Sequence, residues 1–392
     1  MCDTFCVRRA DRTLFAKNSD RPPNEPQIVD SRPRRGAGTV ATQYLTLSDP
    51  GAAAVVASRP TWLRGAEHGV NEHRVAIGNE KIWTVDDPRD DPPALLGMDL
   101  VALVLDRARD ADHGLAVLTA LLSEHGQGGS GEADRDVPYY SSFLIADPQR
   151  GWIVETSGRR FAARPAHAGD AISNRVTIGT DWTVASGDVA AGTDIDTWRS
   201  PRIPTGIADH RLAATRACVA RATTPAELVA TLRHHGERPW GAPGTPADDV
   251  ALPPPEVGDD FSGISVCMHT RGADTTTASM VCDLPVDDNE VVRAWFALGS
   301  PCASVFVPAF PPFVAPELAQ PEQWWRFARL RERVEHDAGC LAEVRAELAP
   351  VEAALWAEAE MCPRDAGGAA ARSDFAAHAF GPVDGALRRL GV

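Results

Sequence analysis

The sequence predicts an α+β protein in which a long body of strands and helices is followed by a helical extension. Three observations lead to this class. Short segments rich in β-branched and aromatic residues recur between residues 2 and 298 and are typical of strands. Two apolar stretches at 93–109 and 112–124 indicate buried helices. From residue 321 onward, apolar residues recur at helical spacing among Arg and Glu, which predicts further helices.

Composition places the chain among folded proteins and excludes some partners. Its 392 residues are 44% hydrophobic and 24% charged, which suits a sizeable core. A net charge of −15 argues against nucleic acid and anionic membranes as partners, because both attract basic surfaces. No apolar run reaches the roughly 18 residues of a membrane span, and the N-terminus lacks the apolar core of a signal peptide. We therefore expect a cytoplasmic protein.

The first two elements predict a hairpin. Strands at 2–7 and 13–16 are joined by a short polar loop. A four-residue loop would place Cys2 opposite Lys17, and a shift of one or two residues would place it opposite one of the next two residues along. Each register brings the start of the chain beside residues 17–20.

Later elements follow from the same patterns. The second helix should end at Gly126, a plausible C′ glycine. The proline-rich stretch 239–258 predicts an exposed loop, and Pro350 and Gly367-Gly368 should break the C-terminal helices. Strands are expected at 54–58, 75–79, 140–146, 151–156, 161–163, 264–269, 278–283 and 293–298, with 151–156 and 161–163 forming a hairpin.

Cysteine and histidine spacing predicts no metal and no disulfide framework. The eight cysteines contain no C-x-x-C pair and no zinc-finger spacing with histidine. His125, His234 and His235 have no metal-like partners nearby in the sequence. Cys6 follows Cys2 on the same strand at about 13 Å, too far for a disulfide, and is interpreted as a core residue. We expect no cofactor.

Cys2 combines two reactive groups if Met1 is removed. Its α-amine, with a pKa near 7.7–8.0, could accept the proton of its own thiol, so one residue would be both nucleophile and general base. Lys17, one of only two lysines, would lower the pKa of the thiol, and Asp20 could orient the α-ammonium. The occurrence of the other lysine, Lys81, is attributed to chance. Taken alone, Cys2 could also be an ordinary second residue.

Several motifs together resemble the secernin branch of the C69 dipeptidase family. They cover residues 2–165 densely and reappear near Gly299-Ser300-Pro301-Cys302. The matching stretches are residues 2–5, 15–22, 58–67, 69–73, 79–80, 95–100 and 124–129. The resemblance implies an N-terminal nucleophile hydrolase, an αββα four-layer sandwich of two stacked sheets between helices. It assigns residues 2–320 to that domain and residues 321–392 to a helical extension packed on it.

The resemblance also implies site residues. Lys17 stands where bile-salt and penicillin amidases have arginine. Asn79, or Glu80 if the alignment shifts, is a candidate oxyanion donor, and Asn174 is a candidate orienting amide. The candidate substrate-binding residues are Arg211, Asn71 and Trp62, although Asn71 could instead order its loop.

The expected activity is hydrolysis of a small peptide, dipeptidase-like, through a thioester on Cys2. One alternative is an amidase that acts on a non-peptide acyl amine with the same nucleophile. The other is a non-catalytic, secernin-like interaction protein whose partner surface is the charged helical extension. Self-association through that extension is left open.

Overall fold

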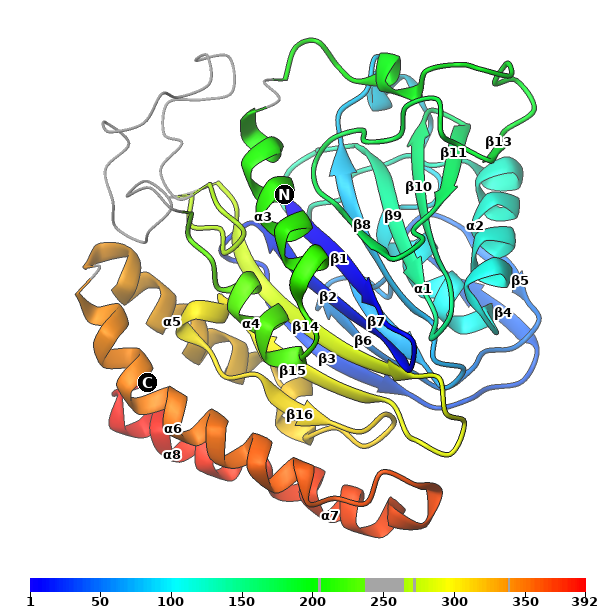
Figure 1. The fold of residues 1–392 in the computed structure, drawn as a ribbon. Helices are drawn as coiled ribbons and strands as arrows, with labels where there is room; N and C mark the ends of the chain where they lie inside the picture. Colours follow the sequence, from blue (N-terminus) through cyan, green and yellow to red (C-terminus); the bar gives the residue numbers. More distant parts are fainter. Residues whose placement is uncertain (204–205, 237–263, 271–272, 338) are drawn as a thin grey trace.

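The computed structural model describes residues 1–203, 206–236, 264–270, 273–337 and 339–392. In this part of the chain, two antiparallel sheets lie face to face and helices cover the outer face of each (Figure 1). Three separate apolar clusters fill the spaces between the four layers. The predicted α+β class and the αββα order of layers are confirmed.

The first sheet contains the start of the chain. Its strand order is β12-β1-β2-β14-β15-β16. Helices α3 (Gly206–Arg221) and α4 (Pro225–Leu232) cover its outer face, where Phe5 packs with Leu212 and Leu228. The strands are β1 (Cys2–Arg8), β2 (Arg12–Arg21), β12 (Gly169–Ile172), β14 (Thr275–Pro285), β15 (Arg293–Leu298) and β16 (Val307–Ala309).

The second sheet has the order β13-β11-β10-β9-β8-β7-β6-β3. The predicted hairpin of β10 and β11 is confirmed. A separate two-stranded ribbon is formed by β4 (Gly38–Ala41) and β5 (Thr46–Asp49). The strands of the large sheet are β3 (Gln27–Arg32), β6 (Val55–Pro60), β7 (His68–Asn71), β8 (Ala76–Ile82), β9 (Tyr140–Ala146), β10 (Gly151–Ser157), β11 (Arg160–Pro165) and β13 (Val184–Ala185).

Helices α1 (Gly97–Arg107) and α2 (Ala111–His125) cover the outer face of the second sheet. The N-terminus of α2 is capped by Asp110, whose side chain accepts from the main chain of the first turn. The helix ends at Gly126 with φ of 75°, which confirms the predicted C′ glycine. The first helix begins at residue 97 and not at 93, because residues 94–95 form backbone hydrogen bonds with Gly128 instead.

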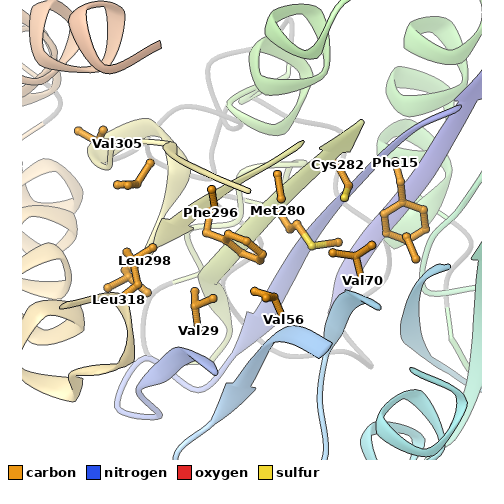
Figure 2. Close-up of a cluster of buried hydrophobic side chains, with 14 of the residues drawn as sticks. Phe15, Val29, Val56, Val70, Met280, Cys282, Phe296, Leu298, Val305 and Leu318 are labelled. Carbon is orange, nitrogen blue, oxygen red and sulfur yellow. The ribbon is translucent and has the colours of Figure 1, made fainter. Parts of the chain in front are cut away.

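An apolar cluster fills much of the space between the two sheets. Phe15 and Met280 of the first sheet meet Val56 and Val70 of the second (Figure 2). Cys6 belongs to the same cluster and is 2% exposed, which confirms its interpretation as a core residue. The side of β1 that carries Cys6 therefore faces the second sheet.

The helical extension packs on the body through its first helix. Trp324 is fully buried, and its Nε1 donates to the main-chain oxygen of Thr277 at 2.8 Å. The predicted break at Pro350 is wrong: this exposed proline lies inside one continuous helix, whose buried face includes Leu348 and Leu355. Solvent can bind the carbonyl that proline leaves without a donor. The helices are α5 (Pro321–His336), α6 (Cys340–Glu360), α7 (Ala369–His378) and α8 (Gly381–Arg389).

Two further expectations concern the region before β14. The predicted strand at 264–269 is wrong, because this segment is irregular and shares only one bridge, between His269 and Thr275. The proline-rich stretch 239–258 lies outside the described residues. Short 3-10 helices are η1 (Pro88–Asp90), η2 (Ile195–Trp198), η6 (Pro301–Ala303), η7 (Pro316–Ala319) and η8 (Ala366–Gly368). Over the ranges that the structure describes, no helix combines the length and apolar character needed to cross a bilayer.

Candidate active site

The β1–β2 hairpin places Cys2 and Lys17 on one face of the first sheet. Cys2 pairs with Ser19, and Thr4 pairs with Lys17. Directly paired residues of antiparallel strands share a face, so these side chains point toward the second sheet, as Cys6 does. Of the expected registers, the one shifted by two residues is observed, and direct pairing of Cys2 with Lys17 is wrong.

The Cys2 side chain is held in a buried position, with 6% of the residue exposed. Its main-chain nitrogen donates to Oδ1 of Asn174 at 2.8 Å, and its Sγ accepts from the main-chain nitrogen of Asp20 at 3.4 Å. Burial raises the pKa of the Cys2 thiol to about 12, and the Lys17 ammonium offsets only part of this rise. Lys17 thus lowers the pKa of the thiol, as predicted, but lost hydration outweighs this one positive charge while Met1 is present.

Lys17 is a fully buried cation. Its Nζ donates to the main-chain oxygen of Asn79 at 2.6 Å and to Glu80 Oε2 at 3.3 Å, and it lies 4.0 Å from Glu67 Oε2. Burial lowers the pKa of Lys17, but the charges of Cys2, Glu80 and Glu67 outweigh it, so the pKa lies above its ordinary value. Lys17 thus stays positively charged next to the Cys2 sulfur.

Arg211 connects the other face of the hairpin to helix α3. Its guanidinium donates to Asn174 Oδ1 at 2.5 Å and to Asp3 Oδ2 at 3.0 Å, and it lies 3.6 Å from Asp20 Oδ2. Thr276 donates to the other Asp20 oxygen at 2.7 Å. Burial raises the pKa of Asp20 to about 7, although the N-terminus and Arg211 oppose the rise. Arg211 is fully buried and its guanidinium contacts only protein groups among the described residues, so its predicted substrate-binding role stays a prediction.

Asn79 and Asn174 are both near Cys2 but have different surroundings. Asn79 lines a pocket together with Cys2, and its buried Oδ1 makes no hydrogen bond within the described residues. Glu80, the other candidate for that place, points toward Lys17 instead. Asn174 donates through Nδ2 to the main-chain oxygen of Lys81 at 2.8 Å, which fixes the amide so that its oxygen faces the Cys2 nitrogen.

The pocket in front of Cys2 is occupied by Met1. The Met1 ammonium donates to the main-chain oxygen of Asp20 at 3.2 Å and lies 3.1 Å from Asp274 Oδ2. The groups around this pocket carry both signs of charge. The lining residues are Met1, Cys2, Asp20, Arg21, Pro22, Glu67, Asn79, Lys81, Gly131, Glu132, Tyr139 and Asp274.

The two remaining predicted substrate contacts do not line this pocket. Asn71 donates to two carbonyls at the end of α1 and accepts from the main chain of His73 and Val75, so all its hydrogen bonds order local structure. These contacts favour the alternative that Asn71 orders its loop over the predicted substrate-binding role. Trp62 donates to Glu25 at 3.2 Å and stacks on Arg21 at 5.9 Å, which places it behind a pocket residue.

Several pocket residues were not predicted from the sequence. Arg21 donates to Glu67 at 2.6 Å, and this pair forms one wall. Lys81, interpreted as chance, also lines the pocket and contacts the rings of Trp83 and Tyr139. Its rarity was the available signal, because only two lysines occur in the chain. Asp274 is distant in sequence and reaches the pocket through β14.

No family model matches the sequence. Among solved structures, penicillin V acylase from Agrobacterium tumefaciens is similar at 11% identity and a TM-score of 0.44, over 82% of this chain and 88% of that one. A mutant conjugated bile acid hydrolase from Clostridium perfringens has 11% identity and a TM-score of 0.42, over 75% and 88%. A Caenorhabditis elegans N-acylethanolamine-hydrolyzing acid amidase ortholog has 8% identity and a TM-score of 0.31, over 45% and 71%. The secernin resemblance stays a prediction.

Proposed function

We propose that the chain is a cysteine hydrolase of amide C–N bonds, dipeptidase-like, with Cys2 as an N-terminal nucleophile once Met1 is removed. The observation that carries this proposal is that one buried cation, one fixed amide and a pocket also lined by Asn79 meet at Cys2. Lys17 lies on its sheet face, Asn174 accepts from its nitrogen, and Asn79 shares its pocket. Such a set is what thiol activation and oxyanion binding require.

Removal of Met1 would change the chemistry of Cys2 in two ways. Its nitrogen becomes an α-amine that can accept the thiol proton, with Asn174 Oδ1 already placed to orient it. The space that Met1 occupies becomes open, so water reaches Sγ and the burial that raises the pKa of Cys2 is reduced. Burial then opposes the thiolate less strongly, so the charge of Lys17 has a larger net effect in favour of it.

The catalytic steps follow from these positions. The Cys2 thiolate attacks the amide carbonyl, and the oxyanion accepts hydrogen bonds from the Asn79 amide and main-chain N–H groups, worth on the order of 3 kcal/mol per donor. The α-ammonium of Cys2 gives its proton to the leaving amine as the C–N bond breaks. Water, deprotonated by the α-amine, then cleaves the thioester and restores the thiol. Asp20 and Arg211 act by positioning.

The position of Met1 supports a substrate whose acyl part is an amino acid with a free α-amine. Met1 is an aminoacyl group on the nitrogen of Cys2, and the proposed thioester would carry a similar aminoacyl group on the sulfur of the same residue. The Met1 ammonium has two acceptors, Asp274 and the main-chain oxygen of Asp20. After Met1 leaves, both acceptors are available to the α-ammonium of a substrate, and Lys81 offers positive charge for a carboxylate at the other end.

The test uses the full chain released from a cleavable N-terminal fusion that leaves Cys2 first. We expect turnover of dipeptides with a free amine, loss of turnover on N-acetylation, and loss of all hydrolysis in Cys2→Ala. Asp274→Asn should raise KM for dipeptides, and Cys218→Ser, a buried cysteine on α3, should be unaffected. Hydrolysis of acyl amides alone would overturn the dipeptidase assignment. Hydrolysis of neither dipeptides nor acyl amides would overturn the assignment as an enzyme and would favour an interaction protein.

A further inference from the structure

A second cluster of reactive side chains lies away from the Cys2 pocket. It consists of His235, Cys267, His269 and Cys302, and one ligand atom from each residue lies within 4.8 Å of all the others. The residues come from three separate segments: the stretch just after α4, the irregular stretch before β14, and η6. Sequence spacing predicted no metal-like partners for His235, and the fold corrects this, because the four residues meet only after the chain has folded.

The distances within the cluster fit a tetrahedral metal site. Nε2 of His269 lies 3.4 Å from Sγ of Cys267 and 3.3 Å from Sγ of Cys302. In a tetrahedral zinc site, with Zn–S of about 2.3 Å and Zn–N of about 2.0–2.1 Å, sulfur and nitrogen ligands lie about 3.5 Å apart. Two thiolates and two neutral imidazoles also balance the charge of a divalent ion, so the occupied site would be neutral, as a buried site should be.

Two observations around the cluster point to a ligand. The Nδ1 of His269 faces Glu335 of α5 at 3.0 Å, so a carboxylate orients the imidazole and leaves Nε2 for the sulfur atoms. The Nε2 of His235 is buried and makes no hydrogen bond within the described residues. A buried nitrogen without a partner is costly, and a metal ion would supply that partner.

We propose that His235, Cys267, His269 and Cys302 bind one zinc ion in a structural site. Four protein ligands complete a tetrahedral shell and leave no open position for water or substrate, which distinguishes this site from a catalytic one. Softer thiolate ligands together with imidazole favour zinc over magnesium, calcium or manganese. The site needs neither Met1 removal nor hydrolytic activity, so it stands or fails independently of the proposed function.

The metal would fix a segment that supports the catalytic strands. Asn18 of β2 donates to the main-chain oxygens of Leu232 and Val266, which flank the ligands His235 and Cys267 in sequence. The main-chain nitrogen of Met268 donates to Thr276, which in turn donates to Asp20. Zinc would therefore stabilise the outer side of the β2 and β14 strands without contacting the substrate.

The first measurement is the zinc content of the full chain, purified without chelators or a metal-affinity tag, by mass spectrometry of the metal. We expect about one zinc per chain. Zinc-edge X-ray absorption on the same sample should show two sulfur and two nitrogen ligands. Cobalt(II) replacement should give the visible bands of a tetrahedral thiolate site. These readouts use the unaltered sequence, so they do not depend on whether a variant folds.

Variants then test the ligand set. Cys267→Ser and His235→Ala should each lower zinc content and cobalt absorption at least tenfold, whereas Cys218→Ser should keep both. A chain that holds no zinc and takes up none on titration with ZnCl₂ would overturn the proposal. So would a disulfide between Cys267 and Cys302 in the purified protein, or full zinc retention in both ligand variants.

Discussion

Replacing Lys17 with methionine tests the buried charge network most sharply. The change keeps a long apolar side chain but removes the ammonium that contacts Glu80 at 3.3 Å and the main-chain oxygen of Asn79 at 2.6 Å. Glu67, the second acidic neighbour, keeps its 2.6 Å bond to Arg21. The substitution therefore leaves one carboxyl group, that of Glu80, without its cation.

The expected cost is about 3 kcal/mol. Breaking a buried ion pair by removing one partner costs about 3–5 kcal/mol. We take the low end because burial raises the pKa of Glu80 to about 8, so this carboxyl can take up a proton instead of staying charged. With an unfolding entropy of about 2.1 cal/mol/K per residue over 392 residues, the cost corresponds to a fall in Tm of about 4 °C.

The assay compares Lys17→Met with the double variant Lys17→Met/Glu80→Gln by thermal unfolding and by hydrolysis. The double variant should regain more than half of the lost stability, because no ionisable carboxyl remains unpaired. Hydrolysis should fall about 100-fold or more in both variants, since neither carries the cation that favours the thiolate. Equal instability of the two variants would contradict the pairing of Lys17 with Glu80. Near-normal hydrolysis in either variant would contradict the role of the Lys17 charge in thiolate formation.

Three further changes have defined outcomes. Glu80→Gln should flatten the pH dependence of Tm. The raised pKa of Glu80 means that its contribution to stability is fully present below pH 4.5 and is lost as pH rises through about 8. An unchanged slope of Tm against pH across that range would contradict the assignment. Asn174→Ala removes the acceptor for the Cys2 nitrogen, so the activation free energy from kcat should change more than the free energy of unfolding. Equal changes in the two free energies would indicate a purely structural amide. Gly126→Ala should cost about 1 kcal/mol in chemical denaturation with hydrolysis unchanged, because the residue has φ of 75°, and no loss of stability would contradict the left-handed cap.

Local patterns predicted the elements that local interactions form. The strand at 140–146 and the hairpin of β10 and β11 were predicted at or near their observed bounds, because short apolar and aromatic runs and a short turn specify them without distant partners. The helix at 112–124 was equally clear, with a glycine at its end. The strand predicted at 264–269 failed because its backbone groups bind Asn18, Thr276 and the segment after α4 instead of a strand ladder.

The site was predictable where its residues stand close in sequence. Cys2, Lys17 and Asp20 meet through a hairpin of the nearest two strands, so any plausible register brought them together. Asp274 and Lys81 were missed because they reach the pocket through β14 and β8, whose pairing depends on the whole sheet. The lowering effect of Lys17 on the Cys2 pKa was predicted, but the larger opposing effect of burial was not, since the degree of burial is a property of the folded chain.

In the proposed mechanism, a free amine and a thiol on the same residue act together. Intact-mass analysis of active protein, before and after labelling with a carbonyl-directed electrophile, probes both groups at once. We expect a chain lacking Met1, a single adduct that maps to Cys2, and no adduct in Cys2→Ala. An active protein that retains Met1, or one labelled elsewhere while Cys2 stays unmodified, would contradict it.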